Sequence, residues 1–192
     1  MIYLLIASYL IGSISSAVII CKILGIPDPR TQGSKNPGAT NVLRLGGKKI
    51  AGFVLTFDGL KGATPVIIGH YLEFGLTQLT LITLCAFLGH IFPVFFRFRG
   101  GKGVATYLGG LIAINLLAGL IFSLIWLLVA KVLKISSMAA LIATALSPFY
   151  FYLITGNLKS TAIIGLISLL IFYTHRDNIR RLINKDENVI QS

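Results

Sequence analysis

Residues 97–103 read R-F-R-G-G-K-G and join two long apolar runs, so that three cations and three glycines lie together. Glycine lets a backbone approach a ligand closely, and a helix beginning here would direct its first N–H groups at an anion. Lys102 adds a full positive charge. The segment therefore predicts a phosphate site; a basic loop at a membrane edge would explain the cations but not the glycines. A Walker A loop is excluded, because Phe96 replaces its first glycine and Gly103 follows the lysine.

Two nearby residues extend this segment. Thr106 follows Lys102 by four residues, which predicts that both lie on one side of the new helix. His90 lies near the end of the preceding apolar run, where a single histidine more often packs or hydrogen-bonds than catalyses.

A second polar segment, 33–44, reads G-S-K-N-P-G-A-T-N-V-L-R. Its Pro-Gly pair is a turn signal, and a short helix is predicted from Ala39 to Arg44. Hydroxyls, carboxamides and an arginine together suit an oxyanion or a polyol, although simple turn chemistry explains this segment alone equally well. The candidate binding residues are Ser34, Asn36, Gly38, Thr40, Asn41 and Arg44.

A third polar segment, 174–182, reads T-H-R-D-N-I-R-R-L. If the preceding helix continues through it, His175 and Asn178 are one turn apart, and Asp177 can pair with Arg181. A basic anchor on lipid headgroups would explain the arginines but not the histidine and the asparagine. The candidate residues here are His175, Arg176, Asn178 and Arg180.

The elements that must position these segments are membrane helices. Of 192 residues, 55% are hydrophobic and only 12% are charged, and apolar runs long enough to cross a bilayer recur throughout. The runs lack the alternation of barrel strands. The net charge of +11 does not indicate nucleic acid, because Lys and Arg gather on the cytoplasmic side of membrane helices.

The predicted spans are 2–21, 50–72, 77–96, 104–129, 136–155 and 160–173. The run 104–129 decides the topology. If this run is one span, the protein has six spans. If it is a short helix to about Asn115 followed by a full span, the protein has seven spans, and the short fourth helix rises only about 20 Å. Seven spans put 15 of the 17 cations on one face. We therefore expect an all-α membrane protein with seven transmembrane helices, a short fourth helix, the N-terminus outside and the C-terminus cytoplasmic.

Charged residues also occur inside the span 50–72. Asp58 and Lys61 are three residues apart, and charges at such depth are costly unless paired, so we expect a structural intramembrane ion pair. Small residues that predict close helix packing recur in the spans: Gly12, Ser13, Ser16, Gly109 and Gly110.

Taken in this order and spacing, the three polar segments resemble the motifs of the bacterial acyl-phosphate:glycerol-3-phosphate acyltransferases, the PlsY family. The motifs G-S-x-N-x-G-A-T-N, G-G-K-G-x-A-T and H-R-x-N-I-x-R-L match residues 33–41, 100–106 and 175–182, and 12–14 and 58–62 also match. The resemblance implies one acyltransferase domain over 1–192 in the bacterial inner membrane, its site facing the cytoplasm. It implies acyl phosphate and glycerol 3-phosphate as substrates, no cofactor or metal, and a functional link to the enzyme that makes acyl phosphate.

The hypothesis for the reaction is direct attack of the glycerol 3-phosphate 1-hydroxyl on the acyl carbon, giving lysophosphatidic acid and phosphate at the start of phospholipid synthesis. The proton goes to His175 or to the donor's own phosphate. The candidate catalytic residues are His175, Lys102 and Arg44. The candidate substrate-binding residues are Ser34, Asn36, Gly38, Thr40, Asn41, Gly101, Gly103, Thr106, Arg176, Asn178 and Arg180, and the Gly101–Gly103 amides are expected to face the donor phosphate.

Two other functions compete. A transporter or flippase for an anionic solute or lipid would also use a buried charge pair and a short broken helix. Against it, no internal repeat is visible and the polar groups gather at one face. A membrane phosphotransferase would need metal-binding carboxylates, and the six acids do not cluster at the three segments.

Overall fold

The computed structural model describes residues 1–189, and within them the chain forms helices and loops without a β-strand. The expected all-α fold is confirmed. Two compact units are present, Met1–Ile114 and a second that begins at Asn115. The boundary lies at the break predicted near Asn115 inside the long apolar run.

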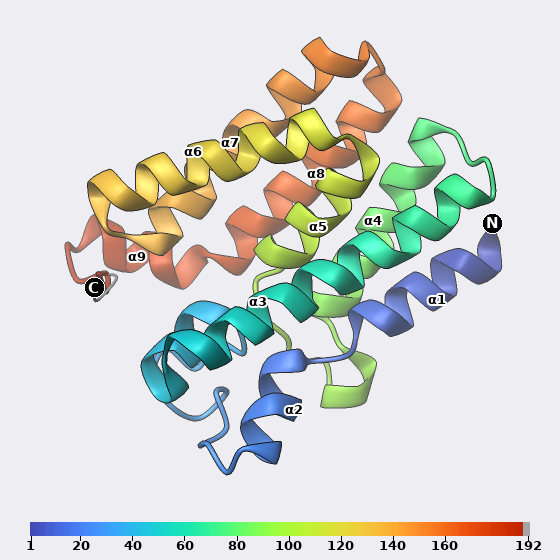
Figure 1. Ribbon diagram of the computed structural model, residues 1–192. Helices are drawn as coiled ribbons and strands as arrows, with labels where there is room; N and C mark the ends of the chain where they lie inside the picture. The colour runs from blue at the N-terminus through green and yellow to red at the C-terminus, as the bar shows by residue number, and fades with distance from the viewer. Residues whose placement is uncertain (190–192) are drawn as a thin grey trace. The chain divides into compact units, whose positions relative to one another are not determined.

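The first unit contains five α-helices and a 3-10 helix among its residues: α1 (Ile2–Gly12), α2 (Ser16–Ile23), α3 (Ala39–Tyr71), α4 (Leu76–Ile91), η1 (Val94–Phe96) and α5 (Val104–Ile114). In Figure 1, α1 to α5 are coloured from blue to yellow-green. A bend of 41° separates α1 from α2. Within α3 the chain is kinked at Gly47, whose φ is 83°. The part of α3 before this kink is the short helix expected from Ala39.

Glycines allow the helices of the first unit to approach closely. A Cβ atom added to Gly12 of α1 would overlap the backbone of Ala86 in α4. Likewise, a Cβ atom on Gly109 of α5 would overlap the backbone of Gly59 in α3, and one on Gly110 would overlap the side chain of Thr83. The close packing predicted at Gly12, Gly109 and Gly110 is confirmed. Because α5 packs against both α3 and α4, this short helix is shielded by neighbours, as a broken membrane helix must be.

The second unit contains α6 (Leu116–Leu133), α7 (Ser136–Thr155), α8 (Leu158–Thr174) and α9 (Arg176–Ile183). Asn115 caps α6 by accepting a hydrogen bond from the Ala118 N–H at 2.9 Å, and Asn157 caps α8 in the same way. The last helix does not run straight, because the chain bends by 60° between α8 and α9. His175 lies at that bend, between α8 and α9, which Figure 1 labels.

The length and composition of the helices fit a membrane protein. Among the described residues, four helices are long and apolar enough to cross a bilayer, and the number rises to six if each bent pair forms one span. Helix α5 has only 11 residues. In α6 just 22% of the span is buried within the protein, as expected of a helix that faces lipid. The count of seven spans and the orientation of the termini remain predictions.

Candidate functional site

The first polar segment is folded around the buried amide of Asn41, which lies in the first turn of α3. Its Oδ1 accepts a hydrogen bond from the Ser34 N–H at 2.9 Å, and its Nδ2 donates to the carbonyls of Pro29 (2.9 Å) and Gln32 (3.0 Å). A Cβ atom on Gly33, whose φ is 61°, would overlap Asn41 Oδ1. The amide of Asn41 therefore shapes this loop, and the expectation that Asn41 binds substrate stays a prediction.

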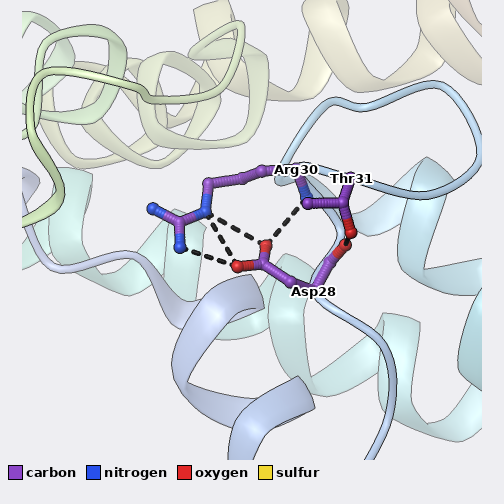
Figure 2. A network of polar contacts seen from close by, with 3 residues as sticks. All are labelled: Asp28, Arg30 and Thr31. Carbon is purple, nitrogen blue, oxygen red and sulfur yellow. Dashed lines mark hydrogen bonds and ion pairs between the residues drawn. The ribbon is translucent and has the colours of Figure 1, made fainter.

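The start of this loop is fixed by an ion pair between Asp28 and Arg30 (Figure 2). Arg30 Nη2 lies 2.7 Å from Asp28 Oδ2, and the Arg30 backbone N–H donates to Oδ1 at 2.9 Å. The side-chain hydrogen bond from Arg30 lowers the pKa of Asp28 below its usual value. Arg30 also lies 6.0 Å from the ring centroid of Phe96, so that it connects the first segment to η1.

The remaining candidates of the first segment lie around the beginning of α3. Gly38 is the N-cap, and its carbonyl accepts hydrogen bonds from the N–H groups of Asn41 and Val42. Ser34, Asn36 and Thr40 are half-buried, whereas Arg44 is exposed. Polar groups and a cation are thus presented from one short helix and the loop before it, as an oxyanion site requires.

The glycine–lysine segment, residues 97–103, is a tight loop between η1 and α5. Arg97 and Phe98 are left-handed, with φ values of 55° and 57°, and the Phe98 N–H donates to Pro93 at 2.9 Å. Gly103 has a φ of 84°, and a Cβ atom there would overlap the ring of Phe87. The lysine itself is half-buried. Helix α5 begins directly after the loop, and the first N–H groups of a helix have no partner within it.

Two expectations for this segment differ from the structure. The Gly101 N–H donates to the His90 carbonyl at 3.2 Å, so this amide is bonded within the protein. Thr106 is fully buried, and its Oγ1 lies 3.1 Å from Nδ1 of His90. The spacing argument placed Thr106 beside Lys102, but the helix begins only at Val104, so Lys102 precedes it.

The intramembrane charges lie behind this loop. Lys61 Nζ is 2.8 Å from Asp58 Oδ1 and also donates to the Ile14 carbonyl at 2.8 Å. The same carboxylate oxygen accepts a hydrogen bond from Ser16 Oγ at 2.8 Å. Lys61 therefore neutralises the carboxylate and satisfies a carbonyl at the break between α1 and α2.

The third polar segment belongs to the second unit. His175 is buried, and its Nδ1 lies 2.8 Å from the Ile171 carbonyl. A carbonyl only accepts hydrogen bonds, so the neutral ring carries its proton on Nδ1 and its lone pair on Nε2. Arg176 and Arg180 are exposed. Asp177 does not pair with Arg181 as expected; its Oδ1 is 3.8 Å from Arg180 Nη1 on the surface.

Glu187 organises this segment, although no sequence pattern pointed to it. Its carboxylate accepts hydrogen bonds from Asn178 Nδ2 (2.7 Å), Arg181 Nε (2.7 Å) and Ser137 Oγ (3.0 Å). Partial burial raises the pKa of Glu187. These hydrogen bonds lower it by a larger amount, so the pKa is below its usual value. Because a carboxylate accepts, Asn178 must turn its Nδ2 to Glu187 and its Oδ1 the other way.

The chain reverses its direction after the last turn of α9, and this reversal places Glu187 against these partners. Lys185 is left-handed, with a φ of 62°, and the Asp186 N–H donates to the Arg181 carbonyl at 2.8 Å. Among residues 1–189, no group of three or more His, Cys, Asp or Glu side chains is placed to hold a metal ion.

Comparison with known proteins gives one consistent result. Residues 2–185 match the family model described as glycerol-3-phosphate acyltransferase. A glycerol-3-phosphate acyltransferase of Ruthia magnifica subsp. Calyptogena magnifica is 62% identical over 98% of this chain and 96% of its own length. One of Legionella pneumophila subsp. pneumophila (strain Philadelphia 1) is 47% identical over 99% of this chain and 69% of its own length.

Two solved structures are also similar. One is the glycerol 3-phosphate form of PlsY (YgiH), an integral membrane glycerol 3-phosphate acyltransferase. It has a TM-score of 0.94 and 38% identity, covering 99% of this chain and 95% of that one. The lysophosphatidic acid form of that protein has a TM-score of 0.91 and 37% identity, covering 98% and 94%.

Proposed function

Because this chain belongs to the glycerol-3-phosphate acyltransferase family, we propose that it transfers a fatty acyl group from an acyl phosphate to the 1-hydroxyl of glycerol 3-phosphate. The products are lysophosphatidic acid and inorganic phosphate. The observation that carries the proposal is the similarity, over nearly the whole chain, to a solved acyltransferase in its glycerol 3-phosphate and lysophosphatidic acid forms. Both units act together as one acyltransferase domain, residues 1–192.

An acyl phosphate suits the residues of this chain as the donor. It is a mixed anhydride whose phosphate is already a good leaving group, so the protein does not need a strong nucleophile of its own. The hydroxyl oxygen attacks the acyl carbon, the new ester bond forms, and the bond to the phosphate oxygen breaks. Lys102 and Arg44 hold the donor phosphate and the charge that develops on the acyl oxygen.

The hydroxyl proton needs an acceptor, and two are available. One is His175, whose Nδ1–H is held by the Ile171 carbonyl so that Nε2 bears the lone pair. The other is the departing phosphate of the donor. Asn178 positions glycerol 3-phosphate, the acyl acceptor. Its Oδ1 points away from Glu187 and can accept a hydrogen bond from a hydroxyl of that substrate. Ser34, Thr40 and Arg180 complete the binding of glycerol 3-phosphate.

The proposed topology has seven spans in the bacterial inner membrane, with the N-terminus outside and the C-terminus and the site at the cytoplasmic face. It is supported by six long or bent candidate spans, to which α5 adds a short one. It is also supported by the 15 of 17 cations that then lie inside. Acyl phosphate arrives from an enzyme that makes it, and its chain lies among membrane lipids.

The test is an assay of purified protein in detergent with palmitoyl phosphate and labelled glycerol 3-phosphate. We expect one inorganic phosphate for each lysophosphatidic acid formed, and no product when an acyl thioester replaces the acyl phosphate. Product from the thioester alone would contradict the proposed donor. Absence of lysophosphatidic acid with every donor would contradict the function itself, and release of phosphate without acylation would point to a different reaction.

A further inference from the structure

A buried polar cluster lies directly behind the glycine–lysine loop of the first unit. It consists of Ser16, Asp58, Lys61, His90 and Thr106, and all five residues are buried. Three of its members are partners of one another, because Lys61 and Ser16 both bond to the carboxylate of Asp58. His90 remains without a part in the proposed chemistry, and its position relative to the loop suggests one.

The loop is built on His90 through its backbone. The His90 carbonyl accepts a hydrogen bond from the Gly101 N–H at 3.2 Å. A Cβ atom on Gly100 would overlap the same carbonyl. This part of the loop therefore lies against the last turn of α4, and only glycine allows so close an approach.

The imidazole ring is in contact with the loop as well. A Cβ atom added to Gly101 would overlap Nε2 of His90, so the ring fills the space where a side chain at residue 101 would lie. The ring thus supports Gly101, the residue immediately before Lys102. A change in the ring would move the loop that carries the lysine.

Two other helices fix the orientation of this ring. Nδ1 of His90 lies 3.1 Å from Thr106 Oγ1 in α5 and 3.7 Å from Asp58 Oδ1 in α3. The ring cannot rotate without leaving the Thr106 hydroxyl, and a buried polar group that loses its partner is costly. Asp58 is itself held by Lys61 and Ser16. The cluster therefore connects α3, α4 and α5 to one edge of the imidazole, while the other edge supports Gly101.

We propose that His90 is a positioning residue for phosphate binding: its imidazole, oriented by Thr106 and Asp58, holds the glycine–lysine loop in the shape that receives the phosphate of the acyl phosphate donor. This rests on the function proposed above. His90 does not itself touch the substrate, because its Nδ1 faces Thr106 and Asp58 and its Nε2 lies against Gly101. Its loss should weaken substrate binding more than the chemical step.

Two substitutions of His90 by shorter side chains distinguish the roles of the two edges of the ring. In His90→Asn the amide retains atoms near Nδ1, so contact with Thr106 persists, but the contact of the ring with Gly101 is lost. In His90→Gln an atom remains near Nε2, so the contact with Gly101 persists. We expect His90→Asn to raise the KM for acyl phosphate by roughly 10- to 100-fold, with a smaller change in kcat. His90→Gln should have a smaller effect on KM.

A control and a rescue make the test specific. His70→Asn is the matched control, since His70 also bonds to a backbone carbonyl of α5, at Ala113 (2.9 Å), but lies near the opposite end of α3. It should leave KM unchanged. Gly101→Ala places a methyl group where Nε2 lies, so it should raise KM alone, and the double variant His90→Asn with Gly101→Ala should recover part of that loss.

If His90→Asn does not fold, the pair Thr106→Val and Thr106→Ser replaces it. Valine removes the hydroxyl that holds Nδ1 and should raise KM, whereas serine keeps the hydroxyl and should not. The proposal is overturned if folded His90→Asn or Thr106→Val has the KM of the wild type. It is also overturned if kcat alone falls, or if Gly101→Ala and His90→Asn are simply additive. A wild-type protein without acyltransferase activity would instead contradict the proposed function.

Discussion

The Nζ atom of Lys61 lies 2.8 Å from Oδ1 of Asp58, one helical turn away, with both side chains more than 90% buried inside α3. Removing either partner leaves the other charge buried and uncompensated. We expect Asp58→Leu or Lys61→Met to reduce the free energy of unfolding by about 3–5 kcal/mol.

The double variant tests this explanation. Asp58→Leu with Lys61→Met buries no charge, so it should be less destabilised than either single variant. Unfolding in detergent, followed by circular dichroism, measures all three. If the effects of the single variants add in the double variant, the two charges do not stabilise each other.

The glycine at position 101 should be required for substrate binding. Gly101→Ala must displace the His90 ring, so we expect the KM for acyl phosphate to rise by roughly tenfold or more. Gly52→Ala is the matched control, because nothing lies within 4 Å of a Cβ atom at that position in α3. It should preserve activity and stabilise the helix slightly. Equal kinetics for the two variants would contradict the close contact.

The Glu187 carboxylate should hold the end of the chain against α9. Glu187→Gln removes the charge that receives hydrogen bonds from Asn178, Arg181 and Ser137, so amide hydrogen exchange in residues 176–189 should become faster. Asp186→Asn makes the same change at the adjacent exposed residue and should not affect exchange.

The pH dependence of this contact follows from the direction of the pKa shift. The pKa of Glu187 is lowered in the folded protein, so its stabilising effect is present above the usual value of 4.5 and is lost as the pH falls through the lowered pKa. The protection of residues 176–189, which is the exchange rate corrected for the intrinsic pH dependence of amide exchange, should therefore fall below about pH 4.5 toward that of Glu187→Gln. Protection that is independent of pH there would indicate that the carboxylate is not required.

His175 should be needed for the chemical step. We expect His175→Gln to lower kcat by about 10²-fold or more, because a positioned general base contributes about 10²–10⁴-fold. The pH–rate profile identifies the proton acceptor. If the imidazole accepts the proton, the fall in rate toward acidic pH disappears in the variant; if the donor phosphate accepts it, the profile keeps its shape. Unchanged kcat would exclude any role for His175 in the reaction.

The sequence predicted the helical fold and the break at Asn115 well, because apolar runs and their interruptions directly reflect the thickness of a bilayer. The close packing at Gly12 and Gly109 was predictable for a similar reason, since small residues have few other uses inside a span. The bend of 60° at His175 was not, because the chain there has no proline or glycine to announce it.

Side-chain directions were harder to predict than elements. The sequence identified Asn41 as a polar residue but could not show that its amide faces its own loop. Thr106 was misplaced because spacing arguments need the first residue of a helix, and Gly103 delays that start. Glu187 was missed because it lies after the third polar segment, next to Asp186 in a tail of mixed charge; only the reversal at Lys185 brings it to Asn178.

The proposed site requires that the glycine–lysine loop and the segment after α8 face the same side of the membrane. Single-cysteine variants Arg99→Cys and Arg176→Cys, both at exposed positions and made after replacing Cys21 and Cys85, can be labelled with a membrane-impermeant maleimide. Lys159→Cys, in α8 next to the turn after α7, serves as the control for the outer face. We predict that Arg99→Cys and Arg176→Cys react only in inside-out vesicles, whereas Lys159→Cys reacts only in intact cells. Labelling of Arg99→Cys and Arg176→Cys from opposite sides would contradict a single cytoplasmic site.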